Sequence, residues 1–77
     1  MRKIREGDLV ILRSDVYTSS SLRVIRKNSI VLFVAEDSYD STMKKMTIIA
    51  DGQLESFFTG AKPEYWFIRL CRPDDTL

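Results

Sequence analysis

The sequence predicts a small all-β fold, a barrel of five to six antiparallel strands with one short 3₁₀ turn. Short β-branched and aliphatic runs recur along the chain, polar turns separate them, and no long stretch carries apolar residues at helical spacing. Closing the sheet into a barrel would remove exposed strand edges. Because 77 residues leave room for one modest core, we expect one domain over 1–77, with 1–6 and 72–77 as loosely held ends.

The first strand is expected over residues 9–13, a short β-branched run introduced by Gly7-Asp8. Apolar residues fall on both of its faces, which predicts a strand that is covered on both sides or strongly bent, as barrel strands are. Residues 14–21 are rich in Ser and Thr and predict a loop, with Tyr17 near its tip. A second strand is expected at 22–26.

Residues 30–35 form the most apolar run of the chain and are expected to be the central strand. A three-residue turn before this run would pair Leu22 with Val34 and Val24 with Leu32. The expected neighbour of the central strand is therefore the strand that precedes it in the sequence.

The stretch 43–58 carries the strongest turn signal of the chain, Asp51-Gly52. About half of the residues in the runs on either side of it are apolar. A two-residue turn would place Ile48 opposite Glu55. A three-residue loop that begins one residue earlier, with the glycine in the left-handed conformation, would place Ile48 opposite Leu54. We expect the three-residue loop, because it sorts apolar with apolar and polar with polar across the two strands.

The remaining segments connect and close the fold. An acidic, polar loop is expected over 36–42, with Tyr39 at its middle. Residues 60–64 contain Gly and Pro and predict a turn or a single 3₁₀ turn. The aromatic and aliphatic run 65–71 predicts the last strand, and a polar tail follows it.

The charge balance narrows the classes of partner. Twelve basic and eleven acidic residues give a net charge of +1, which argues against a bulk electrostatic attraction to nucleic acid or to an anionic membrane. No window approaches the roughly 18 continuous apolar residues of a membrane span. The single cysteine, Cys71, cannot form an internal disulfide. We therefore expect a reducing, cytoplasmic setting, or a place in a larger particle assembled there.

Catalytic and metal-binding motifs are weak, so we expect no enzymatic activity, no cofactor and no metal. Histidine, the commonest general base and metal ligand, does not occur in the sequence. Cys71 is best interpreted as a small packing residue. The carboxylates of Glu36, Asp37 and Asp40 lack the alternating spacing and the glycine of a calcium loop, which favours a solvated acidic loop.

The order of the expected elements resembles that of SH3-like small β-barrel proteins, KOW-like ones included, of the short kind encoded by phages and bacteria. The resemblance covers most of the chain, and its literal motifs are the opening Gly7-Asp8-Leu9-Val10 and the hairpin Asp51-Gly52. The chain lacks the Ala-Leu-Tyr-Asp-Tyr motif of proline-binding SH3 domains, so recognition of PxxP peptides is not implied. It also lacks the glycine expected in the middle of the KOW motif, which makes that match incomplete. The resemblance implies a phage-encoded accessory or virion-associated protein, located in the host cytoplasm or in the assembled virion.

Four residues are candidates for a protein-binding groove. In an SH3-like barrel the first loop, the second loop and the turn before the last strand lie along one side, which would gather Tyr17, Tyr39, Pro63 and Tyr65. Exposed aromatic side chains of this kind offer rigid contact area with a polar handle. The expected function is a non-enzymatic protein-interaction module whose partner is a host or virion component, or a second copy of the chain.

Two alternatives stay open. A KOW- or Tudor-like barrel that binds nucleic acid would use basic side chains to contact phosphates. The candidates for that role are Arg23, Arg26, Lys27, Lys44 and Lys45. The other alternative is a small inhibitor or regulator of a host enzyme.

Overall fold

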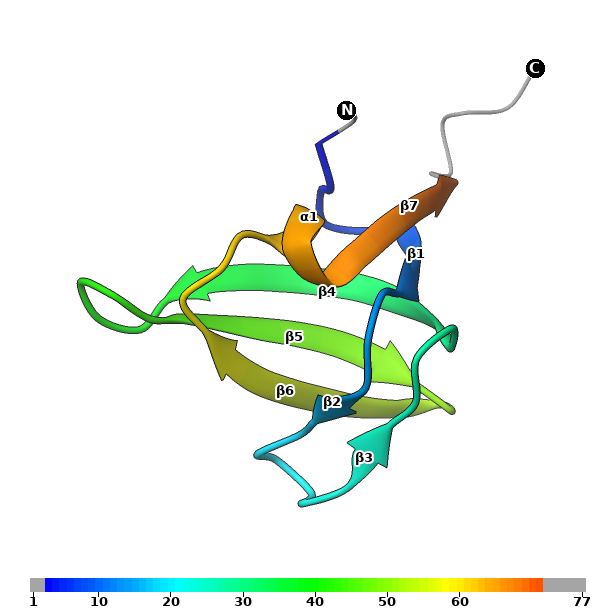
Figure 1. Ribbon diagram of the computed structural model, residues 1–77, viewed down its shortest axis with the longest axis horizontal. Coiled ribbons are helices and arrows are strands. Elements are labelled where there is room, and N and C mark those ends of the chain that lie inside the picture. Colours follow the sequence, from blue (N-terminus) through cyan, green and yellow to red (C-terminus); the bar gives the residue numbers. More distant parts are fainter. Residues whose placement is uncertain (1–2, 72–77) are drawn as a thin grey trace.

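The computed structural model describes residues 3–71 and confirms the expected all-β class (Figure 1). The expected tail at 72–77 and residues 1–2 lie outside the described residues. The described part contains strands β1 (Leu9–Leu12), β2 (Val16–Tyr17), β3 (Val24–Ile25), β4 (Ile30–Ser38), β5 (Lys44–Ala50), β6 (Gln53–Thr59) and β7 (Phe67–Cys71), and one helix, α1 (Pro63–Trp66). The strand count is seven and not five to six, because β2 forms within the segment expected to be a loop.

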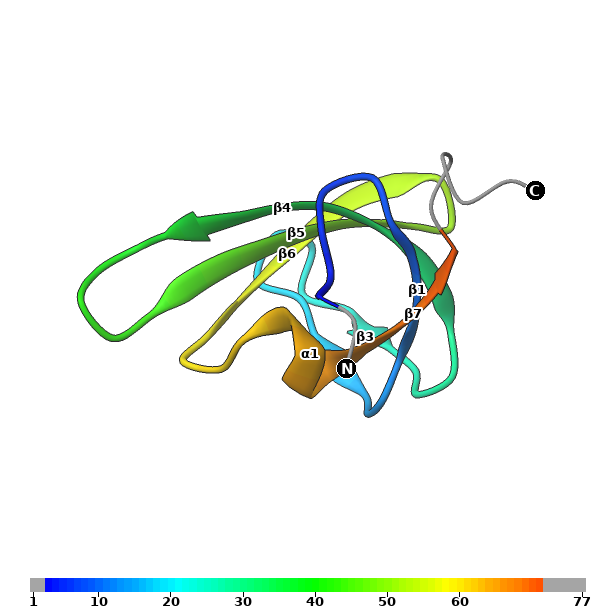
Figure 2. The same cartoon turned by 90° about the horizontal axis from the view of Figure 1, so that it is seen from above.

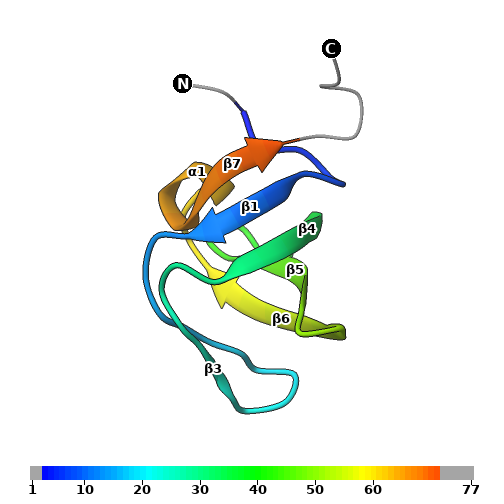
Figure 3. The same cartoon turned by 90° about the vertical axis from the view of Figure 1, so that its right-hand side faces the viewer.

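The strands form two sheets and not a closed barrel, so the barrel prediction was wrong. A five-stranded antiparallel sheet has the order β6-β5-β4-β1-β7 (Figure 3). Strands β2 and β3 pair separately. The central position of β4 agrees with its apolar sequence. The edge strands β6 and β7 approach through side chains and not through backbone pairing. The ring of Phe57 lies 6.1 Å from that of Phe67 and 5.5 Å from that of Trp66.

The core lies on one side of the five-stranded sheet and is filled by alternate residues of its strands. The aromatic rings of Phe33 and Phe67 meet edge to face at 5.5 Å. Ile4 is also buried in this core, and its N–H donates to Glu64 Oε2 at 2.7 Å. Ile4 is therefore held by packing and by this hydrogen bond, whereas the side chains of Lys3, Arg5 and Glu6 are exposed. The buried apolar residues are Ile4, Val10, Leu12, Val16, Ile25, Val31, Phe33, Met46, Ile48, Ala50, Phe57 and Phe67.

The central strand β4 lies between β5 and β1, so the expected pairing of 22–26 with 30–35 was wrong. Leu32 pairs with Leu9 and not with Val24, which lies in β3 opposite β2. The turn before β4 explains the difference. Asn28 adopts a left-handed φ of 73° and its N–H donates to the carbonyl of Leu12, so the chain enters β4 beside the first strand.

The β5–β6 hairpin has a two-residue turn, so the expected three-residue loop was wrong. Ala50 pairs with Gln53, and Ile48 therefore lies opposite Glu55. Asp51 and Gly52 both have positive φ, 54° and 77°, as a type I′ turn requires. The twist of this turn matches that of the strands, and this preference outweighs the sorting of apolar and polar residues across the hairpin.

The expected 3₁₀ turn is a four-residue α-helix, and the expected last strand begins at Phe67 and not at 65. The N–H of Phe67 donates to the carbonyl of Pro63, four residues earlier, which is the α-helical spacing. Pro63 suits the first position of this helix because it has no N–H to satisfy. The helix sets Tyr65 and Trp66 beside the start of β7.

Candidate functional site

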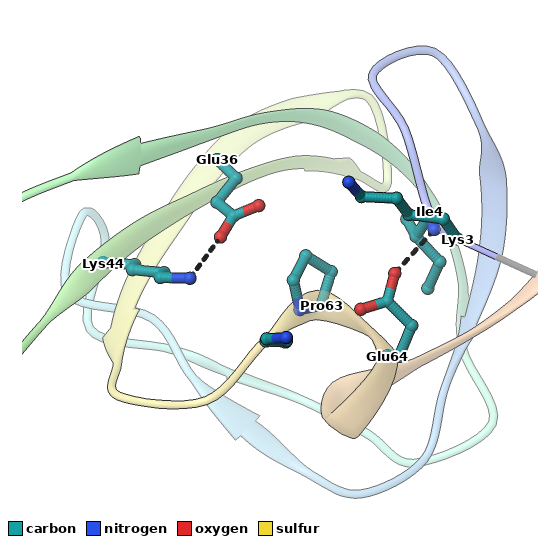
Figure 4. A pocket seen from close by; sticks show the side chains of 7 residues that line it. Lys3, Ile4, Glu36, Lys44, Pro63 and Glu64 are labelled. Carbon is teal, nitrogen blue, oxygen red and sulfur yellow. Dashed lines mark hydrogen bonds and ion pairs between the residues drawn. The ribbon is translucent and has the colours of Figure 1, made fainter.

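A pocket of about 170 Å³ lies where three segments meet: the N-terminal segment, the end of the β4–β5 hairpin and the start of α1. Figure 4 shows charged side chains of both signs around it, with the Pro63 ring between them. The lining residues are Lys3, Ile4, Glu36, Lys44, Lys62, Pro63 and Glu64. The fold therefore brings together residues that lie far apart in the sequence.

Both acidic side chains of the pocket are already engaged. Lys44 Nζ lies 2.9 Å from Glu36 Oε2, and Glu64 Oε2 accepts the N–H of Ile4 at 2.7 Å (Figure 4). Lys62 immediately precedes α1, is exposed, and makes no ion pair with any residue of 3–71. The pocket thus offers a lysine ammonium group that has no carboxylate partner in the described part of the chain.

The three candidate tyrosines are all well exposed, and the structure separates them. Tyr65 packs edge-on against Trp66 in α1, with ring centroids 5.4 Å apart. Tyr39 packs edge-on against Phe58 at 4.8 Å, at the end of the β4–β5 hairpin that projects from the molecule (Figure 2). Tyr17 lies in β2. Among the described residues, no aromatic contact joins these tyrosines to one another.

Of the candidate protein-binding residues, Pro63 lines the pocket and Tyr65 follows it in the same helix. Pro63 itself is buried, so its ring forms part of the pocket wall. Tyr17 and Tyr39 do not line the pocket. The structure therefore brings together two of the four residues and places the other two on separate elements.

The five candidate basic residues for nucleic acid are also distributed over several elements. Arg23 pairs with the carboxylates of Asp51 and Glu55, and Lys44 pairs with Glu36. Lys45 lies on the opposite face of β5 from Lys44 and is paired across the strands with Asp37. The remaining two, Arg26 and Lys27, are exposed and adjacent on the turn between β3 and β4.

A buried carboxylate, Glu55, is the main polar feature that the sequence did not reveal. Its Oε1 accepts hydrogen bonds from Ser21 at 2.6 Å and from Ser20 at 2.8 Å, and its Oε2 lies 3.0 Å from Arg23 Nε. These contacts join the β2–β3 hairpin to the edge strand β6. The signal that could have found Glu55 is the two-residue turn, which sets it opposite Ile48 on the core side.

The hydrogen bonds from Ser21 and Ser20 hold the pKa of Glu55 below its ordinary value, with a smaller contribution from the charge of Arg23, while burial opposes the shift.

Further contacts from the β2–β3 segment cover the same edge of β6. The amide of Ser19 donates to the carbonyl of Ser56 at 2.9 Å, and the amide of Ser56 donates to Ser20 Oγ at 3.0 Å. We interpret the Glu55 contacts as structural, because they place a cation beside a buried carboxylate and cover an exposed strand edge.

The loop between β4 and β5, which the sequence predicts to be acidic and solvated, is held by the Asp40 carboxylate. Asp40 Oδ1 accepts the amides of Thr42 and Met43, each at 2.8 Å, and these bonds lower the pKa of Asp40. Within residues 3–71, no three His, Cys, Asp or Glu side chains gather closely enough to hold a metal ion.

The single helix of the described residues, α1, has four residues and is too short to span a membrane. The side chain of Cys71 lies outside the described part.

Comparisons of the chain with models of protein families, with curated proteins and with solved structures gave no match. The function therefore has to be argued from the residues of this chain.

Proposed function

We propose that the chain is a non-enzymatic protein-interaction module with an SH3-like arrangement of strands. The pocket beside α1 carries the proposal. Its volume of about 170 Å³ lies below the roughly 300–1,000 Å³ of typical small-molecule sites, and suits one side chain of a protein partner. Its charged lining adds the polar contacts that orient such a side chain.

The strand order supports the SH3-like part of the proposal. In that arrangement the second loop and the turn before the last strand border the same side of the molecule. The pocket is lined by Glu36 and Lys44, which flank the β4–β5 loop, and by Pro63 from the turn before β7. Tyr39 and Tyr65 are exposed near these two borders and are each braced by a second ring, so they can contact a partner at little cost in side-chain entropy.

The partner is expected to present an acidic side chain. Lys62 would supply the opposite charge, since the other charged side chains around the pocket interact with groups within the chain. The resemblance to small SH3-like proteins of phages and bacteria favours a phage-encoded accessory or virion-associated protein, whose partner would be a host or virion component. Inhibition of a host enzyme is a special case of this proposal, recognised when the captured partner is an enzyme whose activity falls on binding.

The test is capture of partners from the native host or from infected cells, after nuclease treatment, followed by mass spectrometry. Lys62→Glu is compared with Lys27→Glu, which reverses an exposed lysine outside the pocket. The wild-type chain and Lys27→Glu are expected to capture the same protein, and Lys62→Glu to lose it. Equal affinity of that protein for all three chains would contradict a binding role for the pocket.

The wider aromatic groove is tested separately. Tyr65→Ala and Tyr39→Ala are expected to weaken the binding of the captured protein, each by about 1–2 kcal/mol if the ring is a central contact. Tyr17 lies in β2 and lines no part of the pocket, so Tyr17→Ala measures how far the groove extends. If Tyr17→Ala and Tyr39→Ala both leave the affinity unchanged, the groove predicted from the sequence does not exist.

The alternative is a KOW- or Tudor-like nucleic-acid-binding function. One observation favours it, the exposed adjacent pair Arg26 and Lys27 on the turn before β4. Binding to heparin or to an oligonucleotide that weakens steeply with salt, and that Lys27→Glu reduces, would favour this alternative. Under the protein-interaction proposal, Lys27→Glu leaves partner capture intact.

A further inference from the structure

The face of the five-stranded sheet that points away from the core carries an aliphatic row across four strands. Leu54 pairs with Ile49, Ile49 lies opposite Leu32, and Leu32 pairs with Leu9. Directly paired residues of antiparallel strands project their side chains from the same face of the sheet. The row therefore runs from β6 through β5 and β4 to β1.

A second aliphatic row lies beside the first and extends the face to β7. Ile11 pairs with Ile30 on one side and with Ile68 on the other. Ile11 and Leu9 are two residues apart in β1, so both rows belong to the same face. We call these seven residues the aliphatic face: Leu9, Ile11, Ile30, Leu32, Ile49, Leu54 and Ile68.

The aliphatic face is unusual because its apolar side chains are exposed. The solvated side of an ordinary antiparallel sheet carries polar residues. The exposed fractions are 64% for Leu54, 59% for Ile30, 45% for Ile68 and 36% for Ile49. Together with the half-buried Leu9, Ile11 and Leu32, these side chains leave roughly 500 Å² of apolar surface, near the upper end of what a monomer exposes. Toward the β4–β5 loop the face ends at a polar pair, Thr47 and Ser56.

We propose that the aliphatic face binds the same face of a second copy of this chain, in a two-fold symmetric dimer. The composition of the face favours this occupant. It consists of leucine and isoleucine and carries no charged residue, which fits the more apolar composition of homodimer interfaces. Permanent homodimer interfaces resemble a protein core cut in half, and this face has that composition.

The area and the charges also suit a second copy. Pairing two such faces removes roughly 1,000 Å² from water before backbone and rim atoms are counted, which reaches the lower limit of a specific interface. A two-fold axis brings identical patches together, and an uncharged patch does so without opposing like charges. Two-fold pairing also compensates for the small core of a 77-residue chain.

The dimer leaves the pocket beside α1 open, so this inference stands apart from the proposed function. Glu36 pairs across the strands with the buried Met46, and Lys44 lies two residues from Met46 in β5. These pocket residues therefore lie on the face opposite to Leu32 and Ile49. The dimer would present two pockets to one partner or to two.

Sedimentation equilibrium of the full chain over a wide concentration range tests the proposal. Leu54→Glu and Ile30→Glu place a charge at the two most exposed positions of the aliphatic face. Val24→Glu is the matched control, because Val24 is 51% exposed and lies in β3, outside the five-stranded sheet. The wild-type chain and Val24→Glu are expected to dimerise equally, and each face variant at least about thirtyfold more weakly.

A second measurement needs no variant. Methyl resonances of Ile49 and Leu54 are expected to shift as the wild-type chain is diluted, whereas those of the buried Ile48 stay unchanged. A wild-type chain that is monomeric at all concentrations overturns the proposal. A dimer that both face variants retain, or whose dilution shifts avoid the aliphatic face, also overturns it, since the interface then lies elsewhere.

Discussion

Arg23 Nε lies 3.0 Å from Oε2 of Glu55, a carboxylate that is 1% exposed, and this ion pair joins the β2–β3 hairpin to the edge of the five-stranded sheet. The hydroxyls of Ser20 and Ser21 satisfy the other oxygen of the carboxylate. Because a buried charge without its partners is strongly destabilising, the hairpin and β6 are expected to stay together until the chain unfolds. The two sheets are therefore coupled by a polar contact as well as by the apolar core.

Glu55→Gln is expected to lower stability at neutral pH and to reduce the loss of stability in acid. The hydrogen bonds from Ser21 and Ser20 depress the pKa of Glu55 in the folded chain below 4.5. A group of this kind contributes stability that is present above its unfolded-state pKa and is lost as the pH falls through its folded-state pKa. Thermal midpoints measured from neutral to strongly acidic pH should therefore fall more steeply below about pH 4.5 for the wild-type chain than for the variant.

Asp51→Asn is the control for the same ion-pair system. Asp51 Oδ2 lies 3.2 Å from Arg23 Nη2, but its side chain is 85% exposed, and exposed ion pairs contribute little. Asparagine also accepts the left-handed φ of 54° at this position. The stability of this variant should match that of the wild-type chain. A loss as large as that of Glu55→Gln would mean that the buried carboxylate is not the important partner of Arg23.

Gly52→Ala is expected to destabilise the chain by about 1–2 kcal/mol, because a Cβ atom opposes the left-handed φ of 77° in the type I′ turn. A Cβ at Gly52 would meet no atom within 4 Å, so the effect is conformational and not steric crowding. Urea unfolding measures it, with the exposed neighbour Gln53→Ala as the control. A midpoint unchanged by Gly52→Ala would contradict the two-residue turn.

Thr59→Val is expected to cost about 1–3 kcal/mol, since it removes a hydroxyl that satisfies two donors. Thr59 Oγ1 accepts the indole N–H of Trp66 at 2.9 Å and the amide of Ala61 at 3.0 Å. These bonds join the end of β6 to α1. Thr59→Ser keeps the hydroxyl and should retain most of the stability. Denaturant unfolding followed by Trp66 fluorescence distinguishes the two variants, and equal losses would show that packing and not hydrogen bonding matters at this site.

Asp40→Ala is expected to speed amide hydrogen exchange at Thr42 and Met43, because the Asp40 carboxylate accepts both amides. The same bonds keep the pKa of Asp40 low, so protonation in acid should lower the protection factors of these two amides, relative to their intrinsic exchange rates, in the wild-type chain as well. Asp40→Asn retains an acceptor oxygen and should preserve most of the protection. Exchange rates that are identical in Asp40→Ala and the wild-type chain would contradict this role in the turn.

Turn chemistry and alternation predicted several elements correctly. The apolar run 30–35 predicted the central strand, and Asp51-Gly52 predicted the hairpin. The loop length failed by one residue, because the prediction assumed that Glu55 needs a polar neighbour across the hairpin. Its partners come instead from the serines of the β2–β3 segment, more than thirty residues earlier in the chain.

The proposed binding surfaces were harder to predict from the sequence. Apolar residues on both faces of 9–13 suggested a strand that is covered on both sides or strongly bent, and the structure leaves Leu9 and Ile11 half-buried on an outward face. The pocket was represented by Pro63 among the candidate protein-binding residues and by Lys44 among the basic ones. Lys62 was not singled out from the sequence. Its charge stands out only because the nearby carboxylates of Glu36 and Glu64 are bound to other groups, Lys44 and the N–H of Ile4.

The sequence by itself determined the all-β class, the central strand and the position of the hairpin turn, since strand propensity and turn preference act between residues close in the chain. Only the tertiary structure decided that β1 and not β3 lies beside β4, that Glu55 is buried against Arg23, and that aliphatic residues of five strands share one face. These features depend on contacts between distant segments. Their energy depends on which strands become neighbours, and local patterns leave that choice open.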